Sequence, residues 1–190
     1  IVQAFYSICI IMSEVPSGYF ADRLGRKDSM LIGVLSGSIG FFIYANAYIL
    51  EQFLLAQFFI ALGTSFISGS DTALLYDTLL SLKCQDDYKK MAGRMASVSS
   101  FSEGFAGLAG GVLALISLRT PLYCQASLMV IILPIVLSLR EPPRPYRNET
   151  DGKWQAILSI IHYALSKNKE VKWLIFYSSL VGTSTLTIVW

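Results

Sequence analysis

The sequence predicts an all-α, polytopic membrane helix bundle, and two observations lead to it. Of the 190 residues, 54% are hydrophobic and only 15% are charged, whereas about a quarter of the residues in soluble domains are charged. The charges are bunched between six apolar runs, each near the ~20 residues with which a helix crosses a bilayer. These runs lie near residues 1–19, 29–50, 53–74, 95–118, 121–139 and 171–190.

The placement of the positive charges supports the same six spans independently of hydropathy. If the runs alternate in direction, fourteen of the fifteen Lys and Arg residues fall in loops on one side, and Arg119 falls on the other. Such an excess is typical of cytoplasmic loops. We therefore expect an integral, multi-pass protein of the plasma (inner) membrane, with the loops 18–28, 83–94 and 140–172 in the cytoplasm.

The longest of these loops is the natural domain boundary. It opens at 141–145 with a proline-rich stretch that ends a helix. Apolar residues at helical spacing then predict an amphipathic helix over 154–165, lying on the membrane surface. We expect three segments: five spans in 1–140, a cytoplasmic linker with this helix in 141–170, and a further span in 171–190.

The loop after the first run carries a spaced set of glycines and charges. In order, these residues are Gly18, Asp22, Arg23, Gly25, Arg26 and Lys27. Gly18 permits close helix contact, Gly25 can take the backbone through positive φ, and the basic residues hold the loop on the cytoplasmic side. With an apolar run on each side, this spacing resembles the signature that major facilitator superfamily transporters carry between their second and third helices.

The resemblance implies that the six runs are helices two to seven of about twelve. We therefore expect a partial major facilitator fold: an internal piece of a longer transporter, without its first helix and nearly all of its second six-helix half. The loop 140–172 falls where this family joins its two halves. The resemblance covers the whole chain in layout, but in residue detail only the signature loop and parts of helices four and five.

The resemblance also implies a latch between the two halves at the signature loop. Asp22 would face the second half, and Asp77, at the inner end of helix four, would pair with Arg26. Arg94, at the start of helix five, is a second candidate partner for Asp77. Pairs that form in one state and break in the other bias an alternating-access equilibrium.

Two departures from the family pattern bear on the mechanism. Gln57 stands where the family often has an arginine that is linked to proton coupling, which puts coupling of the usual kind in doubt. Residues 106–111 keep the double glycine that many drug–proton antiporters carry in helix five, but lack the proline. The second departure weakens the drug-antiporter hypothesis without removing it.

Three carboxylates lie within apolar runs, where an acid is costly and usually faces protein or a water-filled cavity. Glu103 lies deepest, ~13 Å into its helix at ~1.5 Å per residue, near the midplane where transporters bind substrates. It could bind a cationic substrate, exchange a proton or bond a neighbouring helix. Glu14 and Asp71 lie nearer the inner face, where we expect them to belong to the latch more than to take part in coupling directly. Tyr6 and Gln57 could line the cavity.

Small residues predict where helices approach closely. One group shares the face of Glu103 and should turn that carboxylate towards protein. Its members are Ser100, Gly104, Gly107, Gly110 and Gly111. A second group, with a packing role alone, lines the second apolar run at Gly33, Gly37 and Gly40.

The favoured function is secondary active transport of a small organic solute by alternating access, with proton-coupled multidrug efflux as the first hypothesis. A sugar, peptide or organic-anion carrier of the same fold is the alternative, as is a transport-inactive membrane receptor or scaffold. An enzyme is disfavoured because the sequence has no paired catalytic acids, histidine cluster or metal-ligand cluster. We expect no cofactor, metal or nucleic acid; the expected partners are the bilayer, the solute and protons.

Overall fold

The computed structural model describes residues 1–142, Trp173 and Tyr177. The chain divides into two units, Ile1–Arg144 and Pro145–Trp190, and in the second unit the two described residues are both helical. The amphipathic helix expected over 154–165 lies outside the described residues, as does most of the span expected over 171–190.

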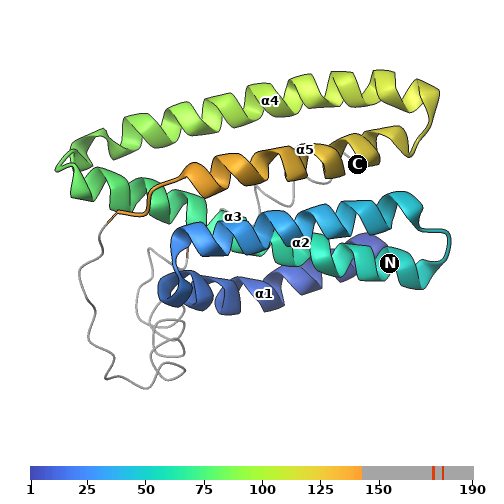
Figure 1. Cartoon of the computed structure of the whole chain (residues 1–190), viewed down its shortest axis with the longest axis horizontal. Helices are drawn as coiled ribbons and strands as arrows, with labels where there is room; N and C mark the ends of the chain where they lie inside the picture. The colour runs from blue at the N-terminus through green and yellow to red at the C-terminus, as the bar shows by residue number, and fades with distance from the viewer. Residues whose placement is uncertain (143–172, 174–176, 178–190) are drawn as a thin grey trace. The chain divides into compact units, whose positions relative to one another are not determined.

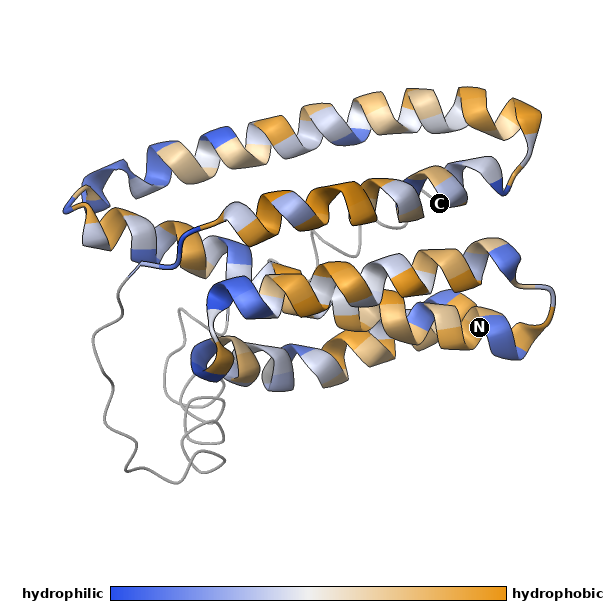
Figure 2. Ribbon diagram, viewed as in Figure 1, coloured by the Kyte–Doolittle hydropathy of each residue, from blue (hydrophilic) through white to orange (hydrophobic). Residues whose placement is uncertain are grey.

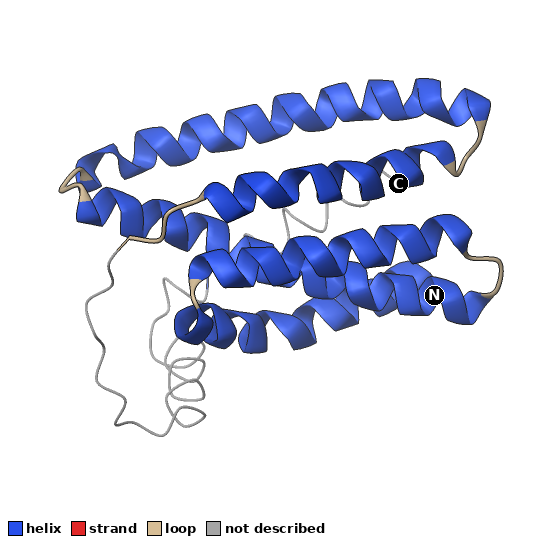
Figure 3. Cartoon of the chain, viewed as in Figure 1, coloured by secondary structure: helices blue, strands red, loops and turns tan. Residues whose placement is uncertain are grey.

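The first unit is all-α, as the sequence predicts. Short turns connect its helices (Figures 1 and 3), and residues 1–142 contain no strand. The elements are α1 (Val2–Leu24), α2 (Arg26–Asn46), α3 (Leu50–Ser81), the 3-10 turn η1 (Gln85–Asp87), α4 (Tyr88–Ile116) and α5 (Thr120–Ser138).

The helices carry their apolar residues along most of their length and their polar residues towards the ends (Figure 2). In the described part of the chain, α2, α3, α5 and the stretch from η1 through α4 are long and apolar enough to cross a membrane. α1 is not among these four; it contains the shorter apolar stretch Val2–Glu14, and the charged pair Asp22 and Arg23 lies near its end. These helices are those of a partial membrane helix bundle.

The expected loop at 18–28 is almost entirely helical, which corrects that prediction. α1 continues to Leu24 and α2 begins at Arg26, so that Gly25 alone separates them. No glycine or proline stands between Gly18 and Gly25 to end α1 earlier. Gly25 has a φ of 127°, in the region that glycine enters without steric cost, as the sequence analysis expected.

α2 and α3 pack with their backbones in contact. A Cβ atom on Gly63 of α3 would lie 2.7 Å from the carbonyl oxygen of Gly33 and 2.8 Å from the backbone nitrogen of Gly37. A Cβ atom on Gly40 would lie 2.8 Å from the backbone nitrogen of Ile60. The close packing expected at the glycines of α2 is therefore present. α3 lies against Gly33 and Gly40, whereas a Cβ atom on Gly37 would lie 2.7 Å from the sulfur atom of Met129 in α5.

α1 joins α3 through small polar side chains. The hydroxyl of Ser17, which is buried, lies 3.1 Å from the carbonyl oxygen of Ser65, to which it donates a hydrogen bond. Ser17 also lies 3.0 Å from the carbonyl oxygen of Glu14. Small side chains at these positions let the two helices approach closely, and the hydroxyl bonds one to the other.

α4 stands apart from this packing. It contacts α3, η1 and α5 and lies along the edge of the bundle (Figure 1), and none of its residues is buried against the rest of residues 1–142. A Cβ atom on any of Gly104, Gly107, Gly110 and Gly111 would meet no described atom within 4 Å, and the same holds for Gly18 in α1. Within the described chain, the close packing expected at these glycines is therefore not formed.

The glycine contact between α2 and α3 makes a direct prediction about stability. Gly63→Ala should lower the melting temperature of the purified protein, because its new Cβ would press on backbone atoms of α2, and overpacking costs about 1–3 kcal/mol. Gly69→Ala, in the same helix but with open space around it, is the matched control and should leave the melting temperature unchanged or raise it. Equal melting temperatures for the two variants would contradict this account of the packing.

Candidate functional site: a charge cluster at the Gly25 end

The turn at Gly25 brings charged residues of three helices together at one end of the bundle. We call this the Gly25 end; here α1, α3 and α5 finish, and α2 and α4 begin. A guanidinium nitrogen of Arg26 lies 2.7 Å from Asp22 Oδ1, and Arg26 Nε lies 3.7 Å from Asp77 Oδ2. Arg26 in α2 thus lies between a carboxylate of α1 and a carboxylate of α3.

The two carboxylates differ in their exposure. The side chain of Arg26 is 17% exposed and that of Asp77 is 27% exposed, whereas that of Asp22 is 66% exposed. Solvent screens an ion pair more strongly when its members are exposed. Asp77 is therefore the ion-pair partner of Arg26 on the packed side of the cluster, at a distance beyond that of a hydrogen bond. Asp22 presents a carboxylate at the surface of the described bundle.

Glu141 is a member of this cluster that the sequence analysis missed. Its Oε1 accepts the backbone N–H of Arg26 at 2.8 Å, and its Oε2 lies 2.7 Å from where a Cβ atom on residue 25 would stand. The sequence analysis treated 141–145 only as the proline-rich start of a linker. The sequence did contain a signal for this contact. Glu141 is an acidic residue just after α5, at the same end of the bundle as the start of α2, whose first N–H groups need an acceptor.

Three other basic residues of the Gly25 end lie outside the ion pairs of Arg26. Lys27 Nζ donates a hydrogen bond to the carbonyl oxygen of Leu137, at 2.5 Å. The Arg23 guanidinium lies 5.7 Å from the centre of the Tyr19 ring. Arg94 is exposed on the second turn of α4, and in residues 1–142 it forms no ion pair with Asp77, whose cationic partner is Arg26.

Glu103 lies midway along α4 and is exposed. The hydroxyl of Ser99, one turn earlier, donates a hydrogen bond to Glu103 Oε1 at 3.3 Å. It is the only carboxylate in α4. Within residues 1–142 the structure does not bring it together with the cluster around Arg26.

The other candidate residues are distributed over α1 and α3. The hydroxyl of Tyr6 donates a hydrogen bond to Thr64 Oγ1 at 3.4 Å, which links the two helices. Gln57 is buried in α3. Asp71 is half-buried and accepts the backbone N–H of the next residue, and Glu14 is exposed on α1. Among the described residues, no group of histidine, cysteine or acidic side chains could hold a metal ion.

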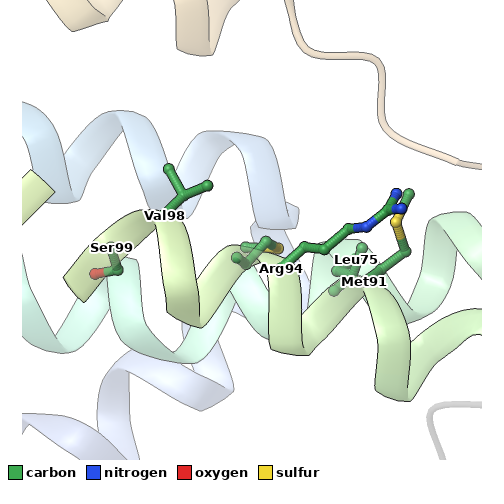
Figure 4. Close-up of a pocket in the computed structure, with 6 residues that line it drawn as sticks. Leu75, Met91, Arg94, Val98 and Ser99 are labelled. Carbon is green, nitrogen blue, oxygen red and sulfur yellow. The ribbon is translucent and has the colours of Figure 1, made fainter. Parts of the chain in front are cut away.

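A hollow of about 520 Å³ opens between α3 and α4 near the Gly25 end (Figure 4). Figure 4 shows the side chains of Met91, Arg94, Val98 and Ser99 on α4 and that of Leu75 on α3. Methionine is flexible and adapts to ligands of different shapes, so the hollow suits an apolar group. It is lined by Leu75, Met91, Arg94, Met95, Val98 and Ser99.

Comparison with known proteins identifies the family. The chain matches the Major Facilitator Superfamily over residues 1–190. It is 30% identical over 155 residues to Multidrug resistance protein 1 of Bacillus subtilis (strain 168), an alignment that covers 80% of this chain and 38% of that relative. No solved structure matches the chain.

The extent of the match and the structure agree. The family match extends over every residue of the chain, and residues 1–142 form a bundle of apolar helices joined by short turns. The chain spans less than half the length of the curated relative that it matches. It belongs to the Major Facilitator Superfamily of membrane transporters.

Proposed function

We propose that the chain is part of a secondary active transporter that exports amphipathic or cationic organic compounds in exchange for protons. The observation that carries the proposal is the family match over the whole chain, joined by a relative that is named a multidrug resistance protein. The hollow between α3 and α4 supports it, because thioether and aliphatic groups line most of its wall and accept apolar groups of varied shape.

Glu103 is the residue that we assign to the transported cation or proton. A carboxylate in the middle of a membrane-spanning helix is costly unless it meets protein, water or a positive charge. Its hydrogen-bonding neighbour in the described chain is the neutral Ser99. Binding a cationic compound or a proton neutralises the carboxylate, so that the two ligands compete for one site, as exchange requires.

The cluster around Arg26 is the latch of this transporter. Arg26 is anchored on the packed side by Asp77, and Asp22 is exposed beside it. We place Asp22 on the side of the cluster that faces the second half of a full-length transporter. A contact made in one conformation and lost in the other shifts the balance between inward-open and outward-open states.

The role of Glu103 can be tested in inverted membrane vesicles that contain the full-length transporter. With an imposed pH gradient, dye transport should fall at least tenfold in Glu103→Gln, a loss of about 1.4 kcal/mol of transition-state stabilisation. The amide keeps the shape of the side chain but cannot take up a proton at neutral pH. The control is Glu51→Gln, which changes an exposed acid in the first turn of α3 and should transport as the wild type does.

Other results would redirect the proposal. If neither the pH gradient nor Glu103→Gln changes the flux, the protein is a uniporter or is coupled at another residue. The absence of flux for every solute tried would favour a receptor or scaffold built on this fold.

The anchor of the latch can be measured with a double-mutant cycle on Arg26→Gln and Asp77→Asn. We expect a coupling of about 1 kcal/mol in the free energy of unfolding, as for pairs that are partly screened by solvent. Unfolding would be followed in titrations with SDS. Asp86→Asn, in the exposed turn η1, replaces Asp77→Asn in the control cycle and should give no coupling. A coupling free energy of zero between Arg26→Gln and Asp77→Asn would show that the two side chains do not stabilise each other.

The orientation of the chain can be tested at a natural cysteine. Cys84, between α3 and η1, is exposed, whereas Cys9 is buried and Cys124 is half-buried. We propose that this loop is cytoplasmic because it belongs to the positively charged side. A membrane-impermeant maleimide should therefore label Cys84 in inverted vesicles but not in intact cells.

Two controls complete the labelling experiment. Cysteines outside this chain are replaced by serine, so that the signal reports on Cys9, Cys84 and Cys124 alone. Cys84→Ser should then abolish the labelling. Labelling of Cys84 in intact cells would reverse the proposed orientation.

A further inference from the structure

α2 and α5 cap each other at the Gly25 end. The first N–H groups of a helix and its last carbonyl groups lack partners within the helix, and the two ends carry partial positive and partial negative charge. Glu141, just after α5, accepts the N–H of Arg26 at the start of α2. Lys27, in the first turn of α2, donates to the carbonyl oxygen of Leu137 in the last turn of α5. Glu141 thus places a negative charge at the start of α2, and Lys27 places a positive charge at the end of α5.

The opposite end of α2 is capped from α5 as well. A guanidinium nitrogen of Arg119, just before α5, lies 3.3 Å from the carbonyl oxygen of Ala47, the residue after α2. The guanidinium also lies 4.1 Å from the centre of the Tyr48 ring. The hydroxyl of Tyr123 donates a hydrogen bond to Asn46 Oδ1 at 2.8 Å. A cation here suits the negative end of the helix.

Arg119 is also the one basic residue that the charge pattern sets on the side opposite the other fourteen. Its contacts with Ala47 and Tyr48 give it a structural role at that end. Its position is therefore consistent with the orientation that the other charges indicate.

We propose that Glu141 and Arg119 are positioning residues that clamp α5 against both ends of α2. Through the backbone of Arg26, Glu141 holds the start of α2 so that the Arg26 side chain reaches both Asp22 and Asp77. The clamp is defined by contacts within the described bundle, and only its effect on transport rests on the function proposed above.

Gly25 is part of the same device. Its φ of 127° turns the chain between α1 and α2, and its missing side chain leaves room for the Glu141 carboxylate, 2.7 Å from the position of a Cβ atom. A larger residue would meet two obstacles, the backbone conformation and the displaced carboxylate. The turn at Gly25 therefore connects α1 to α2 and also leaves space for the carboxylate of Glu141, which follows α5.

The clamp can be read directly by hydrogen–deuterium exchange on the full-length transporter in lipid nanodiscs. Glu141→Ala should speed exchange at the first turn of α2 about fivefold, as the loss of a helix cap does, while peptides from α3 stay unchanged. Glu141→Gln, which keeps an acceptor but no charge, should give a smaller increase. Arg119→Gln should speed exchange at the last turn of α2 instead. Asp86→Asn, the control acid in η1, should change neither turn.

The exchange data decide the clamp without any transport assay. Unchanged exchange at the first turn of α2 in Glu141→Ala, or at the last turn of α2 in Arg119→Gln, would overturn it. A wild-type protein that moves no solute would refute the proposed function and leave the exchange result standing.

A transport assay then tests whether Glu141 acts through Arg26. The maximal rate for each transporter molecule should fall in Glu141→Ala with KM unchanged, because Glu141 positions the latch and does not bind the solute. Glu141→Asp should recover part of the rate. A rate per molecule equal to that of the wild type would overturn the positioning role.

Discussion

The backbone contact between α2 and α3 is the constraint on which the rest of this bundle depends. Lipid gives little hydrophobic drive for helices to associate, so close packing at small residues holds them together. Gly33 and Gly63 let the two backbones approach until an added Cβ would collide with backbone atoms of the other helix. This approach sets the distance between the start of α2 and the end of α3, where Arg26 reaches Asp77.

At the Gly25 end, this packing brings charged residues together through both ion pairs and a hydrogen bond to the backbone. Arg26 uses its guanidinium for Asp22 and Asp77 and its backbone N–H for Glu141. One residue therefore links α1, α2, α3 and the segment after α5. A contact set of this type suits a switch, because moving any one element changes the partners available to a single side chain. The carboxylate of Asp22 is the most exposed of the side chains that form these two ion pairs.

α4 differs from the other helices in a way that matters for transport. Its central carboxylate, Glu103, and the glycines that follow it are not packed against another described helix. Near the Gly25 end it borders the hollow that Met91 and Arg94 line together with α3. The packed part of the bundle and the residues proposed for substrate binding are thus largely separate.

The sequence alone determined the features that are local or periodic. Hydropathy located the helices and their turns, glycine spacing marked the α2 face that packs closely, and Gly25 marked a positive φ. The residues expected to form a loop continue α1 instead, and Gly18 is not closely packed against the described part of the chain. Only the tertiary structure revealed Glu141 and Arg119 as caps of α2, because each contact joins residues 72 to 115 positions apart. Such partners depend on how α2 and α5 pack, and no spacing within the sequence records that.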